Sequence, residues 1–169
     1  MTAKLKRGIT KVKDPGSALT HFIAMILAII AAIPLLSKAG HDSGHMRISA
    51  LAIFILSMIG LYAASTIYHT LDISPKINKL LRKIDHMMIF ILIAGTYTPV
   101  CMIVLGDKTG WTMLTLVWGI AIVGILINAL WITCPKWFSS LIYIAMGWVC
   151  ILAITKILSS MPRAGFMWL

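Results

Sequence analysis

Long apolar stretches separated by short polar connections make up most of this chain. The stretches are roughly Ala18–Leu36, Ile48–Tyr68, Ile84–Leu105, Trp111–Ile132 and Trp137–Leu158. Each is close to the ~20 residues that an α-helix needs to cross about 30 Å of hydrocarbon. None shows the alternation of polar and apolar positions that marks a transmembrane β-strand. The pattern therefore predicts an all-α, polytopic membrane helix bundle with five transmembrane helices, in which neighbouring helices are antiparallel.

The composition supports this class. Hydrophobic residues make up 60% of the chain and charged residues only 12%, whereas soluble domains carry about 25% charged residues. The first apolar stretch follows a basic segment without a small-residue cleavage pattern, so it is expected to be a retained helix and not a signal peptide. Residues 1–16 are expected to form a basic cytoplasmic tail, and residues 17–169 a single transmembrane helical domain.

The net charge of +10 is concentrated at particular connections. Lysine and arginine cluster in the N-terminal tail and after the second stretch, at Lys4, Lys6, Arg7, Lys11, Lys13, Lys76, Lys79, Arg82 and Lys83. The positive-inside rule then places the N-terminus in the cytoplasm. Basic clusters beside a membrane also attract anionic lipid head groups, so the charge is explained without a nucleic-acid partner.

Polar side chains gather where the second stretch ends and the third begins. Ser65 and His69 are four residues apart and share one face of a helix. Asp85 and His86 open the next stretch at the same membrane face. An imidazole beside a carboxylate suits zinc, and a serine nearby can orient the imidazole or a bound water. His69 and Asp85 are therefore candidate metal ligands, and Ser65 and Asp85 candidate catalytic residues.

A purely structural interpretation of these residues also stays open. His69 can sit at the membrane interface, and Asp85 can cap the third helix at its N-terminus. His86 lies about 100° around the helix from Asp85 and is expected to be only a neighbour. His21, near the start of the first stretch, is expected to reach solvent, with a position beside this group as a further polar partner as the alternative. One histidine and one carboxylate also fall short of the three protein ligands of a catalytic zinc site.

Several local signals refine the predicted helices. Asp14 precedes Pro15 at the start of the first helix, where an aspartate can cap free amides. Residues 40–45 are expected to form a polar outer loop. Pro99 lies inside the third stretch and should kink it or loosen its outer half. Residues 164–169 have the pattern of the first turns of a further apolar helix, so the last helix is expected to be incomplete.

Two motifs carry a family resemblance. The segment S-T-I-Y-H ends at His69, and D-H-x-x-I-F-x-x-I-A-G-T-Y-T-P runs from Asp85 to Pro99. Together they resemble the hemolysin III family, the bacterial branch of the progestin and adipoQ receptor superfamily, which includes the adiponectin receptors. The resemblance implies seven helices, a cytoplasmic N-terminus in the bacterial inner (plasma) membrane, and a zinc ion near the cytoplasmic side. His69 matches the zinc-binding histidine, Ser65 its companion, and Asp85 the aspartate that reaches zinc through water.

One departure from the family pattern bears on the metal. The family draws two further zinc ligands from an H-x-x-x-H in its last helix, and this sequence has no histidine after His86. The sequence shows five of the seven helices that the resemblance implies. Zinc binding is expected to be weak if these residues are the whole product, and a truncated product or fragment of a longer protein is the other expectation.

The resemblance also implies candidate functions. The first is zinc-dependent hydrolysis of a lipid amide such as a ceramide, with membrane lipids as partners. A cytolytic or channel-like protein and a metal-dependent lipid sensor are the alternatives. No helix shows the polar stripe that would line a pore.

Overall fold

The computed structural model describes residues 12–42, 45–131 and 136–160, and these are almost entirely helical. The helices are α1 (Pro15–Asp42), α2 (His45–Thr70), α3 (Pro75–Pro99), α4 (Lys108–Leu130), α5 (Lys136–Trp148) and α6 (Ile154–Ser160). The π-helical segment η1 (Val100–Leu105) continues α3, and the 3-10 segment η2 (Val149–Ala153) joins α5 to α6. Most of the predicted basic tail, and residues 164–169 with their predicted further helix, lie outside the described residues.

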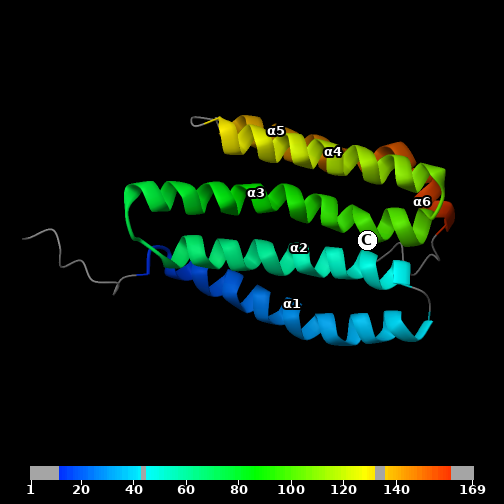
Figure 1. Ribbon diagram of the computed structural model, residues 1–169, viewed down its shortest axis with the longest axis horizontal. Coiled ribbons are helices and arrows are strands. Elements are labelled where there is room, and N and C mark those ends of the chain that lie inside the picture. Colours follow the sequence, from blue (N-terminus) through cyan, green and yellow to red (C-terminus); the bar gives the residue numbers. More distant parts are fainter. Residues whose placement is uncertain (1–11, 43–44, 132–135, 161–169) are drawn as a thin grey trace, which may run out of the picture.

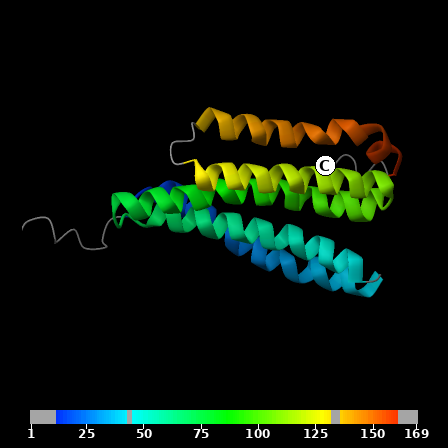
Figure 2. The same cartoon turned by 45° about the horizontal axis from the view of Figure 1, so that its top comes forward.

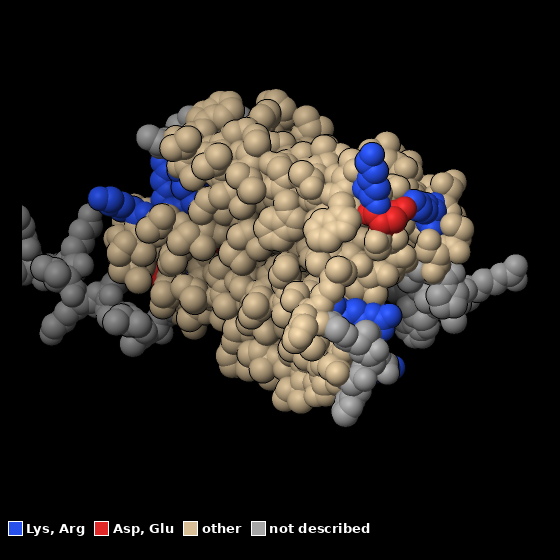
Figure 3. Space-filling view, turned by 45° about the vertical axis from the view of Figure 1, so that its right-hand side comes forward, with Lys and Arg blue, Asp and Glu red and all other residues tan. Residues whose placement is uncertain are grey.

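The predicted membrane architecture is confirmed. Five helical spans of the described chain are long and apolar enough to cross a membrane: Pro15–Gly40, His45–Thr70, Pro75–Leu105, Lys108–Leu130 and Trp137–Ser160. Figure 3 shows lysine, arginine and aspartate gathered toward the two ends of the visible face, with an uncharged belt between them. This distribution is the one expected of helices whose middles lie in hydrocarbon.

The helices lie side by side in chain order (Figures 1 and 2). α2 packs between α1 and α3, and α5 packs against both α3 and α4. α1 is an edge helix whose main partner is α2. The start of α1 and the connection between α2 and α3 lie at one end of the bundle, here called the α2–α3 end. Residues that are far apart in sequence therefore meet at this end.

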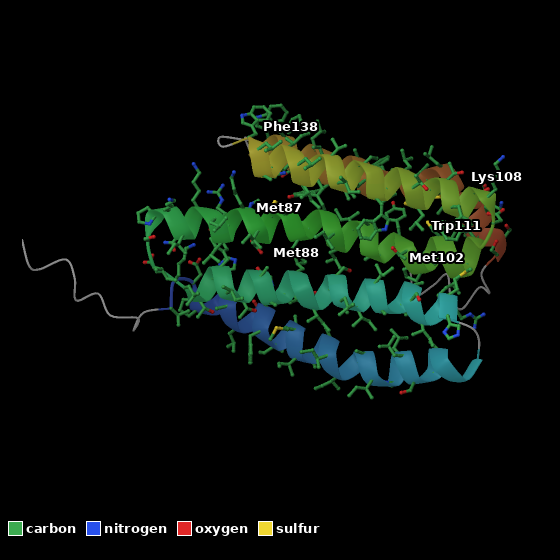
Figure 4. The ribbon with its side chains drawn as sticks, in the orientation of Figure 1. Met87, Met88, Met102, Lys108, Trp111 and Phe138 are labelled. Carbon is green, nitrogen blue, oxygen red and sulfur yellow. The ribbon has the colours of Figure 1, made fainter. Side chains whose placement is uncertain are left out.

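Small residues let the central helices approach closely. A Cβ atom on Gly95 of α3 would lie 2.1 Å from the Ser57 Oγ of α2, and one on Gly124 of α4 would lie 2.4 Å from the Phe90 ring. The Met88 side chain occupies the space above Gly60 in the same way, and Figure 4 shows it on the side of α3 that faces α2. Close backbone approach at small residues is a common way to pack helices in a membrane.

Replacing Gly95 with alanine is expected to destabilise the bundle by about 1–3 kcal/mol, the usual cost of overpacking a tight contact. The reason is the 2.1 Å approach of the new methyl group to Ser57 Oγ. Unfolding in mixed detergent, followed by circular dichroism, measures the change. Gly119→Ala is the matched control, because a Cβ at Gly119 meets nothing within 4 Å. Equal stability of the two variants would show that the helices are not in tight contact at Gly95.

The third helix begins earlier than its apolar stretch. α3 starts at Pro75, and the Ser74 hydroxyl accepts a hydrogen bond from the Ile77 amide. The basic residues before Ile84 therefore lie on the first turns of α3, and the interpretation of Asp85 as a helix cap is wrong. The predicted outer loop is likewise shorter than expected, since α1 continues to Asp42 and α2 begins at His45. Apolar stretches mark the hydrocarbon-spanning part of a helix, and caps mark its ends.

The predicted disturbance at Pro99 takes the form of a π-helix. Proline has no amide hydrogen for the helical ladder, and η1 begins at the next residue, Val100. η1 ends at Gly106, which has a φ of 59° and donates its N–H to the Cys101 carbonyl at 3.1 Å.

The 3-10 segment η2 after α5 contacts α3 through a tyrosine. The Tyr97 hydroxyl accepts the Cys150 N–H at 2.9 Å. Insertion of this hydroxyl into the backbone ladder explains why α5 gives way to a 3-10 turn.

At the end of the bundle opposite the α2–α3 end, a charged pair joins α6 to the start of α4 (Figure 1). Lys156 donates to the Asp107 carboxylate and to the Thr109 hydroxyl, and the Asp107 side chain caps α4 by accepting the Gly110 N–H. Hydrogen bonding from Lys156 and Gly110 holds the pKa of Asp107 below its usual range. The pair therefore fastens the last described helix to the start of α4.

This pair predicts a pH-dependent contribution to stability. Because the folded pKa of Asp107 is lowered, its contribution is fully present above the unfolded value of about 3.9 and is lost as the pH falls through the folded value. Wild type should be more stable than Asp107→Asn at neutral pH, and the difference should shrink below about pH 4. Thermal unfolding from pH 7 to pH 3 measures it. A difference that does not change with pH would contradict the assignment.

Candidate functional site

His69 lies in the last turn of α2 and is held by the segment that precedes α1. Its Nδ1 is 3.0 Å from the Asp14 Oδ2, and its carbonyl accepts the Asp14 N–H at 2.9 Å. The Asp14 carbonyl in turn accepts the Ala18 N–H, so the backbone of Asp14 starts α1. The Asp14 side chain, predicted as a possible helix cap, contacts His69 instead.

Asp85 is a largely buried carboxylate in α3. Its side chain is only 12% exposed. It lies close enough to the Ser65 side chain of α2 and to His69 to interact electrostatically with both. The structure thus brings Ser65, His69 and Asp85 together at the α2–α3 end. A carboxylate at this depth is expensive to maintain, and such groups commonly mark functional sites in membrane proteins.

His86 lies closer to this group than its helical position suggests. Its Nδ1 is 3.7 Å from the Asp85 Oδ2, beyond the normal range of a hydrogen bond. Among the described residues, that nitrogen is a buried polar atom without a hydrogen-bond partner. The His86 carbonyl accepts the Tyr143 hydroxyl of α5 at 2.8 Å. The angle between successive side chains on a helix separates Cβ atoms, but a histidine ring is long enough to turn back toward its neighbour.

His21 also joins the group, the alternative considered for it, while it stays partly exposed. Its ring stacks on the ring of His69 with centroids 5.7 Å apart and an interplanar angle of 15°. The Tyr68 ring lies 4.8 Å from the His69 ring, and the Lys13 Nζ lies 3.6 Å from the Tyr68 centroid. The ring of His69 is therefore confined by neighbours from α1 and α2.

The donor chemistry of this group fits zinc, whereas the number of donors is small. An imidazole that donates its Nδ1–H to a carboxylate keeps the Nε2 lone pair for a metal. His69 can supply that nitrogen and Asp85 a carboxylate oxygen, both of which zinc prefers. The described residues include no group of three His, Cys, Asp or Glu side chains placed to hold a metal ion. The described residues therefore supply two donors of the kind that zinc prefers, fewer than the three protein ligands of a catalytic zinc site.

Comparison with known proteins identifies the family. The model of the haemolysin-III related family matches residues 9–169. The chain belongs to the hemolysin III family. It is 38% identical to Hemolysin-3 of Bacillus cereus over 167 residues, which is 98% of this chain and 76% of that relative. It is also 35% identical to the Hemolysin-3 homolog of Bacillus subtilis (strain 168) over 154 residues, 91% of this chain and 72% of the relative. No solved structure matches.

Sequence reasoning missed the role of Asp14 beside His69. The chain has only five acidic residues, and one of them lies at the start of the first helix, on the same side of the membrane as His69. That scarcity was an available signal. A carboxylate near a candidate metal-binding histidine deserves to be tested as its hydrogen-bond partner before it is assigned to a helix cap.

Proposed function

We propose that this hemolysin III family protein binds zinc at the α2–α3 end and hydrolyses the amide bond of a ceramide-like membrane lipid. The observation that carries the proposal is the buried Asp85 carboxylate, which lies against Ser65 and near His69 inside an otherwise apolar bundle. An acidic group kept at this depth is costly unless it serves a function. The proposal also places this end, with its basic residues, on the cytoplasmic side of the plasma membrane.

Each residue has a definite role in this proposal. His69 would hold the metal through Nε2, and Asp85 would take part through a water molecule. Zinc bound there supplies a Lewis acid that lowers the pKa of a coordinated water toward about 7. The Asp85 carboxylate accepts a proton from the attacking water, and the Ser65 hydroxyl, which lies close to that carboxylate, supports it.

The reaction consumes one water and needs no other reactant. The water oxygen bonds to the amide carbonyl carbon, the C–N bond breaks, and the proton taken by Asp85 passes to the leaving amine nitrogen. The products are a fatty acid and an amine.

The direct experiment uses the purified chain in detergent, stripped of metal and then supplied with Zn²⁺. It is incubated with a fluorescent ceramide, and the released fatty acid is measured by mass spectrometry. Zinc-dependent release is expected. The matched control is Asp72→Asn, which removes a carboxylate at the same end whose partner is the Asn78 side chain. Absence of both bound zinc and fatty-acid release in the wild type would overturn the proposal.

A cytolytic function is the second candidate. The observation that favours it is the name of the two relatives, Hemolysin-3 and Hemolysin-3 homolog. It makes a different prediction. Dye release from liposomes containing the protein would then be unaffected by His69→Ala, since pore formation does not need the metal. Zinc-dependent hydrolysis without dye release would exclude it.

A further inference from the structure

In the described part of the segment before α1, Asp14 is the residue that contacts His69. Asp14 contacts His69 twice, by its N–H to the His69 carbonyl at 2.9 Å and by its carboxylate to the His69 Nδ1 at 3.0 Å. The neighbouring Lys13 N–H reaches the Thr70 carbonyl at 3.4 Å. Two backbone contacts already fasten this segment to the end of α2. The carboxylate contact is therefore not needed to hold the chain in place.

We propose that Asp14 is a positioning residue that holds the His69 imidazole in the form protonated at Nδ1, with Nε2 available to a metal. Asp14 does not itself touch the metal or the substrate. The inference rests on the proposed function for the purpose of this arrangement. The arrangement itself, a carboxylate fixing the tautomer of one histidine, stands on the contacts between Asp14 and His69.

The chemistry of imidazole explains why the carboxylate matters. A neutral ring carries one proton, and the hydrogen bond made by one nitrogen decides which nitrogen keeps the lone pair. A carboxylate only accepts hydrogen bonds, so Asp14 selects the Nδ1–H form. A metal-bound histidine commonly has such a partner, and its removal typically costs about 10–100-fold in metal affinity.

The surroundings of His69 complete the fixation of the ring. The His21 ring stacks nearly parallel on one face, with centroids 5.7 Å apart, and the Tyr68 ring lies 4.8 Å away at 60°. Stacking limits the tilt of the ring but does not distinguish its two nitrogens. The hydrogen bond that the Asp14 carboxylate accepts supplies that distinction, because it involves only Nδ1.

The test compares Asp14→Ala with Asp14→Asn in the full chain. Alanine removes the acceptor, whereas the asparagine side-chain oxygen can still accept the Nδ1–H. Both variants keep the backbone N–H of residue 14, and the Asp14 side chain is half exposed, so folding is expected to persist. The first readout is the ¹⁵N NMR spectrum of labelled histidine in the zinc-free protein. The second is the Zn²⁺ dissociation constant from competition with a chromogenic chelator.

The expected results distinguish a role of Asp14 in positioning the His69 ring from a role only in attaching the segment before α1 to α2. In the wild type, His69 should show the Nδ1–H signal, and Asp14→Ala should shift it toward the Nε2–H form. Asp14→Asn should lie between them, because its amide can either accept from Nδ1–H or donate to an unprotonated Nδ1. Zinc affinity should fall about 10–100-fold in Asp14→Ala and less in Asp14→Asn. Asp72→Asn should change neither readout. An unchanged His69 tautomer in Asp14→Ala would overturn the inference.

The same experiment distinguishes failure of the inference from failure of the proposed function. If the wild type binds no Zn²⁺ but Asp14→Ala still changes the His69 tautomer, positioning by Asp14 is supported and the zinc-dependent function is overturned. If the wild type binds Zn²⁺ and Asp14→Ala leaves both readouts unchanged, the function stands and the positioning role falls.

Discussion

Replacing His69 with alanine is expected to abolish zinc binding, with a loss of affinity greater than the ~100-fold limit typical of changes to a ligand's hydrogen-bond partner. The reason is that His69 is the one predicted ligand that contacts the metal directly through nitrogen, while Asp85 reaches it through water. The measurement is zinc content after gel filtration, together with competition for Zn²⁺ by a chelator. Zinc-dependent fatty-acid release should disappear with the metal.

His45→Ala is the matched control for this prediction. His45 is exposed and begins the same helix, α2, at its opposite end. It therefore reports any general effect of removing a histidine without touching the site. Thermal unfolding of both variants should be measured in the metal-free state, because His69→Ala also removes the contact with Asp14. Equal zinc content in the two variants would rule out His69 as a ligand.

Much of the fold could be predicted because the bilayer simplifies the problem. Helices that cross hydrocarbon must be long, apolar and internally hydrogen-bonded, so the five spans were visible as stretches of sequence. Their ends were harder to place. The start of α3 depends on the Ser74 cap and on Pro75, which lie among charged residues outside the apolar stretch. The 3-10 turn after α5 depends on the Tyr97 hydroxyl, a contact between distant segments.

The candidate site was predictable to the extent that it follows from helical spacing. Ser65 and His69 share a face of α2, and the short connection to α3 brings Asp85 close to them. The contributions of Asp14 and His21 could not be read in this way. Both come from the start of α1, and their positions depend on how this edge helix packs against the end of α2. Spacing within one helix carries no information about that packing.

Replacing Asp85 with asparagine is expected to lower the rate of lipid-amide hydrolysis by about 10²–10⁴-fold, the usual contribution of a general base. Asparagine has nearly the same shape and can still accept a hydrogen bond from Ser65, but it cannot take a proton from water at neutral pH. Because Asp85 is proposed to reach the metal only through water, zinc affinity should fall by no more than about 10–100-fold. The rate is therefore measured at a Zn²⁺ concentration that saturates the variant.

Ser65→Ala provides the comparison that makes this result informative. Ser65 is proposed only to support the Asp85 carboxylate. Removing the Ser65 hydroxyl should therefore reduce the rate at saturating Zn²⁺ far less than Asp85→Asn does. If both variants lost activity only through weaker zinc binding, excess Zn²⁺ would restore them equally, and the role of Asp85 as a base would be contradicted. A rate that stays low in Asp85→Asn but recovers in Ser65→Ala would separate proton transfer from metal binding. That separation explains why a carboxylate is kept where hydrocarbon makes it costly.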